Sequence, residues 1–189
     1  MNTPASLNNK DSIASSAKLA LRPILLSILA IIVSGCGYGY KNVSRAPNLD
    51  HLTRNAAVVV DVQEKGDADA TERSLLANSI VEKLRASGRF GRVDVRQGEI
   101  PDGVDLVVDC HISDIKRVNR AVRILFGAFP GRAWVEIKVI LRNQKEGTID
   151  GEAVIEGASS GGTIFAGITD HAIDNAAQTI SDFVLEIEH

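Results

Sequence analysis

The chain has 189 residues, of which 44% are hydrophobic, 24% are charged and only 4% are aromatic. This composition is typical of a globular protein, and so few aromatic residues argue against a surface that stacks sugars or nucleic-acid bases. Two cysteines exclude a disulfide framework and a cysteine-rich zinc site.

The first 35 residues have the organisation of a secretory signal. Residues 1–22 are polar and carry three basic side chains, and residues 24–33 form an almost unbroken apolar run. A run of this length is too short to cross a bilayer, which needs about 20 apolar residues. We therefore expect residues 1–35 to be a signal peptide. The alternative is an uncleaved signal anchor.

The residues that end this run, Val33-Ser34-Gly35-Cys36, resemble the bacterial lipobox. The resemblance implies cleavage between Gly35 and Cys36, diacylglycerol on the Cys36 sulfur, and acylation of the new N terminus by a chain such as palmitate. Two or more acyl chains anchor a protein stably, whereas one does not. Gly37 follows instead of Asp, which by resemblance to enterobacterial sorting rules implies the outer membrane, with the domain facing the periplasm.

The remaining 154 residues have the size of one ordinary domain. Three of the 21 basic and one of the 24 acidic side chains precede residue 36, so this part carries 18 basic and 23 acidic side chains. Nucleic-acid binders usually have the opposite bias, so we expect no nucleic-acid partner.

Residues 36–55 contain Gly, Pro, Asn and Ser without a helical or strand period, which predicts an acylated cysteine followed by a flexible tether. A single domain is expected over residues 56–189. It begins with a β-branched strand over residues 56–62. A helix over residues 71–87 follows, with Asp69 and Glu72 as a capping box and Gly88 as its stop.

Further strands are predicted from period-two alternation. They are a short strand at 93–95, a long strand at 104–118 and a half-buried strand at 133–142, which a turn at 144–147 joins to a strand over 149–157. In the long strand the apolar phase shifts near Ser113, which indicates a bulge or bend. An Ala-rich amphipathic helix over residues 166–186 ends the chain.

The predicted order is β-α-β-β-β-β-α. It favours an α+β two-layer sandwich, in which a mixed or antiparallel sheet of about five strands carries both helices on one face.

Three stretches carry a family resemblance: residues 56–96, residues 123–133, and residues 157–162 with Asn175-Ala176-Ala177 further on. Together they resemble the bacterial lipoproteins of the domain of unknown function 4410 family, over residues 56–184. The turn at 143–147 departs from the family pattern. The resemblance implies a lipoprotein and a fold, without a known activity. The strand order also resembles the amino-terminal domain of the Tol-system propeller protein, the curli-secretion lipoprotein and lipoprotein activators of cell-wall synthases, an analogy of fold alone.

Residues 115–135 contain no acidic side chain and combine basic with apolar residues. Such a segment fits contact with phosphate-bearing lipid headgroups or with a partner protein. The alternative is a long hairpin whose apolar side chains fold back on the sheet. The candidate contact residues are Arg120, Arg123, Leu125, Phe126, Phe129 and Arg132.

The other candidate sites each have an ordinary structural explanation. Residues 159–163 could bind an anion, but small residues also permit close packing. His171 with Asp174 or Asn175 has metal-ligand spacing that is common on solvated helices. Cys110 lies in the apolar phase of its strand, as a buried residue does. The polar strand face that holds Asp105, Asp109 and His111 is interpreted as solvated.

No constellation of these residues supports catalysis, a cofactor or a metal, so we expect a protein that is not an enzyme. The expected function is a membrane-anchored accessory that binds or assembles another envelope component. The alternatives are a self-assembling secretion-type lipoprotein and a small-ligand-binding domain. The sequence does not set the oligomeric state.

Overall fold

The structure, a computed structural model, describes residues 38–63, 68–118, 132–159 and 168–186. In chain order its elements are β1 (Tyr38–Arg45), β2 (Ala57–Val62), α2 (Ala70–Ser87), β3 (Arg92–Val95), β4 (Leu106–Lys116), β5 (Trp134–Asn143), β6 (Ile149–Ala158) and α4 (Thr169–Val184).

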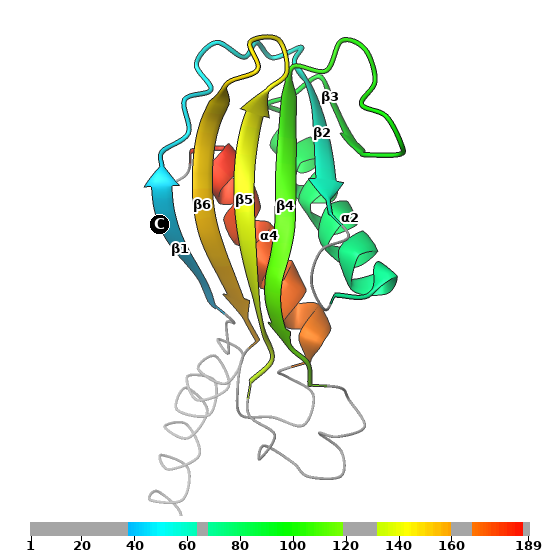
Figure 1. Cartoon of the computed structure of the whole chain (residues 1–189), viewed down its shortest axis with the longest axis vertical. Helices are drawn as coiled ribbons and strands as arrows, with labels where there is room; N and C mark the ends of the chain where they lie inside the picture. The colour runs from blue at the N-terminus through cyan, green and yellow to red at the C-terminus, as the bar shows by residue number, and fades with distance from the viewer. Residues whose placement is uncertain (1–37, 64–67, 119–131, 160–167, 187–189) are drawn as a thin grey trace, which may run out of the picture. The chain divides into compact units, whose positions relative to one another are not determined.

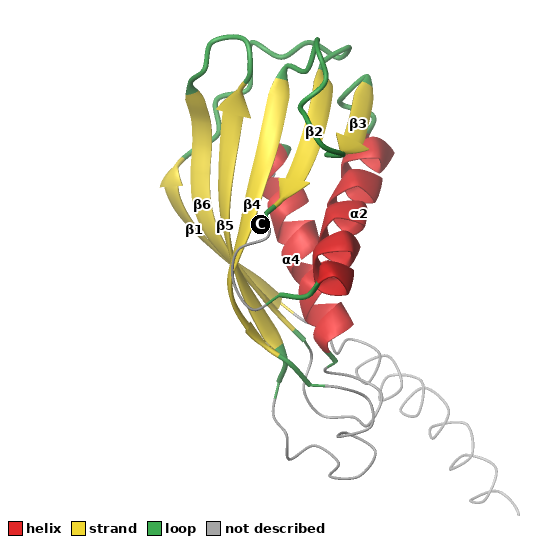
Figure 2. Ribbon diagram, turned by 45° about the vertical axis from the view of Figure 1, so that its right-hand side comes forward, coloured by secondary structure: helices red, strands yellow, loops and turns green. Residues whose placement is uncertain are grey.

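The six strands form one mixed sheet in the order β1-β6-β5-β4-β2-β3 (Figure 1). The pairs β1–β6, β6–β5 and β5–β4 are antiparallel, whereas β2 runs parallel to both β4 and β3. Both helices cover the same face of the sheet, with α2 packed beside α4 (Figure 2). The predicted α+β sandwich is therefore confirmed, with one strand more than expected.

The additional strand is β1, which pairs with β6 at the edge of the sheet. The prediction of a flexible tether over residues 36–55 is therefore wrong for Tyr38–Arg45. An edge strand needs no continuous apolar face, so its sequence lacks the expected alternation. Gly39, which suggested a linker, faces α4, where a Cβ atom would lie only 1.7 Å from Thr179 Oγ1.

The core lies between the helices and the inner face of the sheet. The clean alternation predicted for β5 is confirmed, since every second residue from Val135 to Leu141 is fully buried. The predicted capping box of α2 is also confirmed, with Asp69 and Glu72 each accepting a hydrogen bond from the other's backbone N–H. No helix within the described part of the chain is long and apolar enough to cross a membrane.

The outer face, on the side of the sheet away from α2 and α4, is partly covered by the loop between β3 and β4. Ile100 of this loop packs against a small separate cluster of Val59, Val104 and Val107. Val104, just before β4, therefore lies on the outer face and not in the main core. The predicted irregularity near Ser113 is confirmed by a register shift between Ile112 and Asp114.

Candidate functional site

Four strands have their ends in register at one end of the sheet. Tyr38 pairs with Ala158, Ala158 with Trp134, and Trp134 with Lys116. β1 and β5 begin here and β4 and β6 finish here, at the lower end of the view in Figure 1. We call this the Tyr38 end of the sheet. It is the end closest along the chain to Cys36, which precedes Tyr38 by two residues.

Most of the predicted site residues lie outside the described part of the chain. These are Gly35 and Cys36 at the expected cleavage site, and Arg120, Arg123, Leu125, Phe126 and Phe129 of the basic-apolar segment. The described flanks of that segment, Val118 and Arg132, follow β4 and precede β5, so both lie at the Tyr38 end. The contact predicted for this segment stays a prediction.

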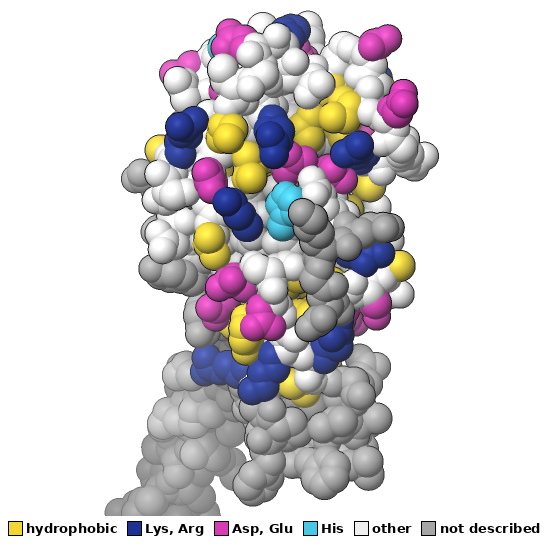
Figure 3. Space-filling view, viewed as in Figure 1, with side chains coloured by type: hydrophobic (Ala, Val, Ile, Leu, Met, Phe, Trp, Pro, Cys, Tyr) yellow, Lys and Arg dark blue, Asp and Glu magenta, His cyan; other side chains and the backbone are white. Residues whose placement is uncertain are grey.

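Basic side chains gather at the Tyr38 end. Figure 3, which views the outer face, shows Lys and Arg side chains along its lower margin. Lys116 and Arg132 are exposed there. Arg117 has a structural role, because its Nε lies 2.6 Å from Glu72 Oε1 and its Nη2 lies 2.7 Å from Glu72 Oε2. This bidentate pair ties the region after β4 to the first turn of α2.

A row of acidic side chains crosses the outer face two residues further along the strands from the Tyr38 end. Asp114, Glu136 and Glu156 are paired in register on three adjacent strands, and none forms an ion pair with another described residue. Like charges placed directly opposite one another destabilise a sheet. Among the described residues, no group of three acidic, His or Cys side chains has the geometry to hold a metal ion.

Charges further along the outer face neutralise one another. The buried carboxylates of Asp61 and Asp109 lie side by side in the register of β2 and β4. Arg96 Nη1 lies 2.6 Å from Asp61 Oδ2, and Arg142 Nε donates a hydrogen bond to Asp109 Oδ2. The interpretation of this strand face as solvated is therefore wrong for Asp109, because the paired arginine and the neighbouring strands exclude water from it.

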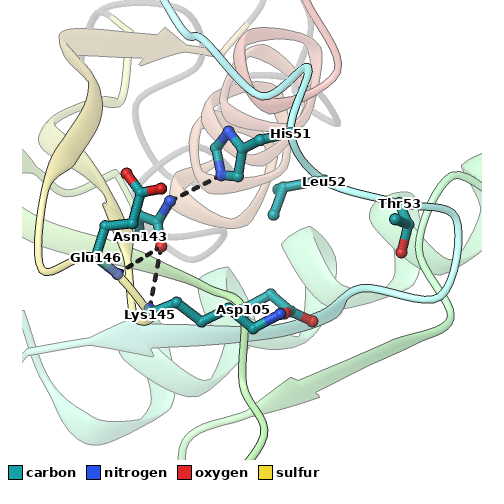
Figure 4. A pocket seen from close by; sticks show the side chains of 7 residues that line it. All are labelled: His51, Leu52, Thr53, Asp105, Asn143, Lys145 and Glu146. Atoms are coloured by element: carbon teal, nitrogen blue, oxygen red, sulfur yellow. Dashed lines mark hydrogen bonds and ion pairs between the residues drawn. The ribbon is translucent and has the colours of Figure 1, made fainter.

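A small pocket of about 220 Å³ lies at the opposite end of the sheet (Figure 4). Its lining residues are His51, Leu52, Thr53, Asp105, Asn143, Lys145 and Glu146. Asp105 Oδ1 lies 2.5 Å from Lys145 Nζ, and its Oδ2 accepts a 2.8 Å hydrogen bond from the Ala57 amide. These two contacts, the lysine first, lower the pKa of Asp105 below its ordinary value.

The histidine of this pocket has two competing neighbours. His51 Nε2 lies 2.9 Å from Asn143 Nδ2 and 3.3 Å from Asp150 Oδ2, a buried oxygen that has no hydrogen-bond partner among the described residues. Asn143 Oδ1 accepts hydrogen bonds from the Lys145 and Glu146 amides, which fixes the amide orientation. A neutral His51 can therefore accept from Asn143, whereas a protonated ring can pair with Asp150.

Neither this pocket nor the hollow beside β3 favours a small-ligand site. Ligand pockets usually occupy about 300–1,000 Å³ and offer a few polar groups to the ligand. The pocket around His51 is smaller than this range. The hollow beside β3 has about 470 Å³, but Arg85 and Arg96 on its wall are paired with Asp94 and Asp61. In both hollows the charged side chains form ion pairs with other residues of the domain, and these pairs stabilise the fold.

The remaining candidates have structural roles. Cys110 is fully buried, as predicted, and burial raises the pKa of its thiol far above the ordinary value. Asp174 forms a 3.0 Å ion pair with Lys83, and Asn175 Nδ2 donates a hydrogen bond to the Ala158 carbonyl. The two residues that could ligate a metal together with His171 therefore already have partners within the domain. Ser159 Oγ accepts from the Ala133 amide at 3.0 Å. Residues 160–163 of the glycine-rich stretch lie outside the described residues.

Sequence reasoning missed three features of these surfaces: the start of β1 directly after Cys36, the buried Asp61–Asp109 neighbours and the pocket around His51. None of the three has a local sequence signal, because each depends on residues that are far apart along the chain.

Comparison with known proteins gives a family and a fold. The family model described as "Domain of unknown function (DUF4410)" matches residues 3–163. No curated protein matches the sequence. The PelC dodecamer from Paraburkholderia phytofirmans is similar in structure, with a TM-score of 0.52 and 16% identity over 78% of this chain and 97% of that one. Protein XCC0632 from Xanthomonas campestris, of the DUF330 family, has a TM-score of 0.42 and 11% identity over 74% of this chain and 88% of that one.

Proposed function

This chain belongs to the family of the domain of unknown function DUF4410, and we propose that it is a lipoprotein anchored through Cys36. In this proposal residues 1–35 are removed and lipid holds the protein at the outer membrane, facing the periplasm. There it acts as a non-enzymatic accessory that binds or assembles another component of the cell envelope.

The observation that carries the anchor is the placement of Cys36 in the sequence. It follows an apolar run of signal-peptide length and the small residues Ser34 and Gly35, and it precedes the first strand by two residues. Cleavage before Cys36 would leave β1 intact, so the folded domain and the expected processing site are compatible. The acyl chains would supply an attachment that the described helices do not.

A binding role is supported by the way in which the described charged groups are used. The buried carboxylates Asp61 and Asp109 are each neutralised by an arginine, and Asp105 is held by a lysine and a backbone amide. These contacts stabilise the fold. The acidic row of Asp114, Glu136 and Glu156 is different, because its charges lie side by side and would be relieved by a partner that brings positive charge.

A second candidate function is self-assembly, which one structural feature favours. Within the described part of the chain β1 and β3 are the edge strands of the sheet, and such edges can pair with another chain. The similar PelC structure is a dodecamer, which is compatible with this second candidate. A ring or other closed assembly would use these edges between identical subunits.

Fractionation of cells that express two cysteine variants tests the anchor. Wild type and Cys110→Ala should be found in the outer-membrane fraction at the size expected after loss of residues 1–35. Cys36→Ser should keep those residues and be absent from that fraction, because no lipid can be attached. A Cys36→Ser protein with the size and location of wild type would contradict the proposal.

Crosslinking in cells, followed by purification of the acylated protein and mass spectrometry, separates the two roles. Recovery of one specific envelope protein, lost when Phe126 and Phe129 are replaced by Ser, would support an accessory that docks through the basic-apolar segment. Recovery of this chain alone, as a defined oligomer, would sink the accessory role and support self-assembly.

A further inference from the structure

The start of β1 restricts how far the domain can stand from an anchor at Cys36. Two residues of extended chain span at most about 7 Å, so the Cα atoms of Cys36 and Tyr38 lie within that distance. Tyr38 is in register with the ends of three further strands, at Ala158, Trp134 and Lys116. If lipid is attached to Cys36, the start of β1 must therefore lie close to the bilayer surface, and the other three strand ends lie at this same end of the sheet.

The side chains at this end suit an interface between water and lipid. Trp134 is the only tryptophan of the chain, and it lies partly buried on the outer face, beside Lys116 in register. Tryptophan is enriched at the headgroup level of membranes, because its ring is apolar and its N–H is polar. Lys116 and Arg132 are exposed nearby and have long stems that can reach headgroup phosphates.

The acidic row limits how deeply this end can enter. Asp114, Glu136 and Glu156 lie two residues inside their strands from these ends, which corresponds to about 7 Å along a strand. Carboxylates are costly to bring among lipid phosphates or into the hydrocarbon. The first row of side chains can therefore touch the headgroups while the second row stays in water.

We propose that the acylated protein rests on the bilayer with the Tyr38 end of its sheet, with the Trp134 indole at headgroup level and Lys116 against lipid phosphates. This inference depends on the anchor at Cys36 put forward above. A flexible tether would let the domain stand away from the membrane in any orientation. In the proposed arrangement the domain lies on the membrane in one fixed orientation. The opposite end of the sheet, with the pocket around His51, then points away from the membrane.

Because Trp134 is the only tryptophan, its fluorescence reports this orientation directly. The full-length acylated protein is reconstituted into vesicles of phosphatidylethanolamine and phosphatidylglycerol, with or without bromine atoms near the headgroup end of the acyl chains. Bromine quenches tryptophan on contact. The proposal predicts that Trp134 emission is weaker in brominated vesicles than in vesicles of the same lipids without bromine.

A matched control moves the probe to the other end of β5. In the double variant Trp134→Phe with Gln144→Trp, the new tryptophan lies about 33 Å further along the strand direction, at ten residues of 3.3 Å each. Gln144 is exposed, so the ring needs no space in the core. This variant should retain its emission in brominated vesicles. Equal quenching of both probes, or none of Trp134, would overturn the proposed orientation.

A charge variant tests the role of Lys116. Lys116→Glu should reduce the quenching of Trp134, whereas Arg54→Glu, an exposed residue in the loop at the other end, should leave it unchanged. Equal effects of the two would remove Lys116 from the proposed contact.

The mass of the N-terminal peptide, measured on the same sample, keeps the two proposals apart. Acylated Cys36 with unquenched Trp134 would overturn the orientation and leave the anchor in place. Unmodified Cys36 would overturn both.

Discussion

Gly39 of β1 lies opposite Gly157 of β6, and both face α4 at positions that have no room for a Cβ atom. A Cβ on Gly157 would lie 2.3 Å from the Ala172 carbonyl oxygen and 2.5 Å from the Ala176 nitrogen. The two glycines allow α4 to cross the edge of the sheet at close range. This contact joins the strand that follows Cys36 to the C-terminal helix.

Alanine at these two positions should have different consequences. Gly157→Ala meets backbone atoms of α4 and should lower the free energy of unfolding by about 1–3 kcal/mol or more, the usual cost of an overpacked core. Gly39→Ala meets mainly the Thr179 side chain, so the added change Thr179→Ala should recover part of its loss. Urea unfolding of the single and double variants measures this. Equal recovery of Gly157→Ala by Thr179→Ala would contradict the described contacts.

The N-terminal cap of α2 predicts that the free energy of unfolding depends on pH in the acidic range. The hydrogen bond from the Glu72 amide is the main reason that the pKa of Asp69 lies below its ordinary value of 3.8. A lowered pKa in the folded state means that the stabilisation is complete above the ordinary value and is lost as the pH falls through the lowered one. Asp69→Asn keeps a cap but carries no charge. The stability difference between wild type and this variant should therefore shrink in unfolding curves recorded at falling pH, and a constant difference would contradict the assignment.

Asp105 and Lys145 should contribute unequally to the stability of the fold, although they form one ion pair. Lys145→Ala removes an exposed partner and should cost less than about 1 kcal/mol. Asp105→Ala also leaves the partly buried Ala57 amide without its acceptor, which should cost about 1–3 kcal/mol. Thermal unfolding of both variants provides the comparison. Equal losses would show that the amide finds another acceptor.

The thiol of Cys110 should be unreactive while the protein is folded. It is fully buried on the inner face of β4, and desolvation favours its neutral form, which is a poor nucleophile. A thiol reagent should label it only as fast as the protein unfolds, with complete labelling in denaturant. Rapid labelling under native conditions would mean that β4 opens locally.

Features that depend on local pattern were predictable from the sequence. The strand β5 alternates because only its inner face is buried, and the residues that cap α2, Asp69 and Glu72, are only three apart. The order of elements then restricts the fold to a sheet with both helices on one face.

Features that depend on distant partners could not be predicted. The need for glycine at position 39 is set by Thr179, which is 140 residues away. The carboxylates of Asp61 and Asp109 become neighbours only through the register of two parallel strands, which no local sequence signal specifies. The same holds for His51 and Asp150, which a loop and a strand bring together.

The central claim, lipid on Cys36, is tested most directly by the mass of the N-terminal peptide of the protein extracted from bacterial membranes. Trypsin cleavage after Lys41 should release residues 36–41, with a mass increased by a diacylglyceryl group and a further acyl chain, and no peptide from residues 1–35 should be found. A peptide that continues through Cys36 without lipid would contradict the account.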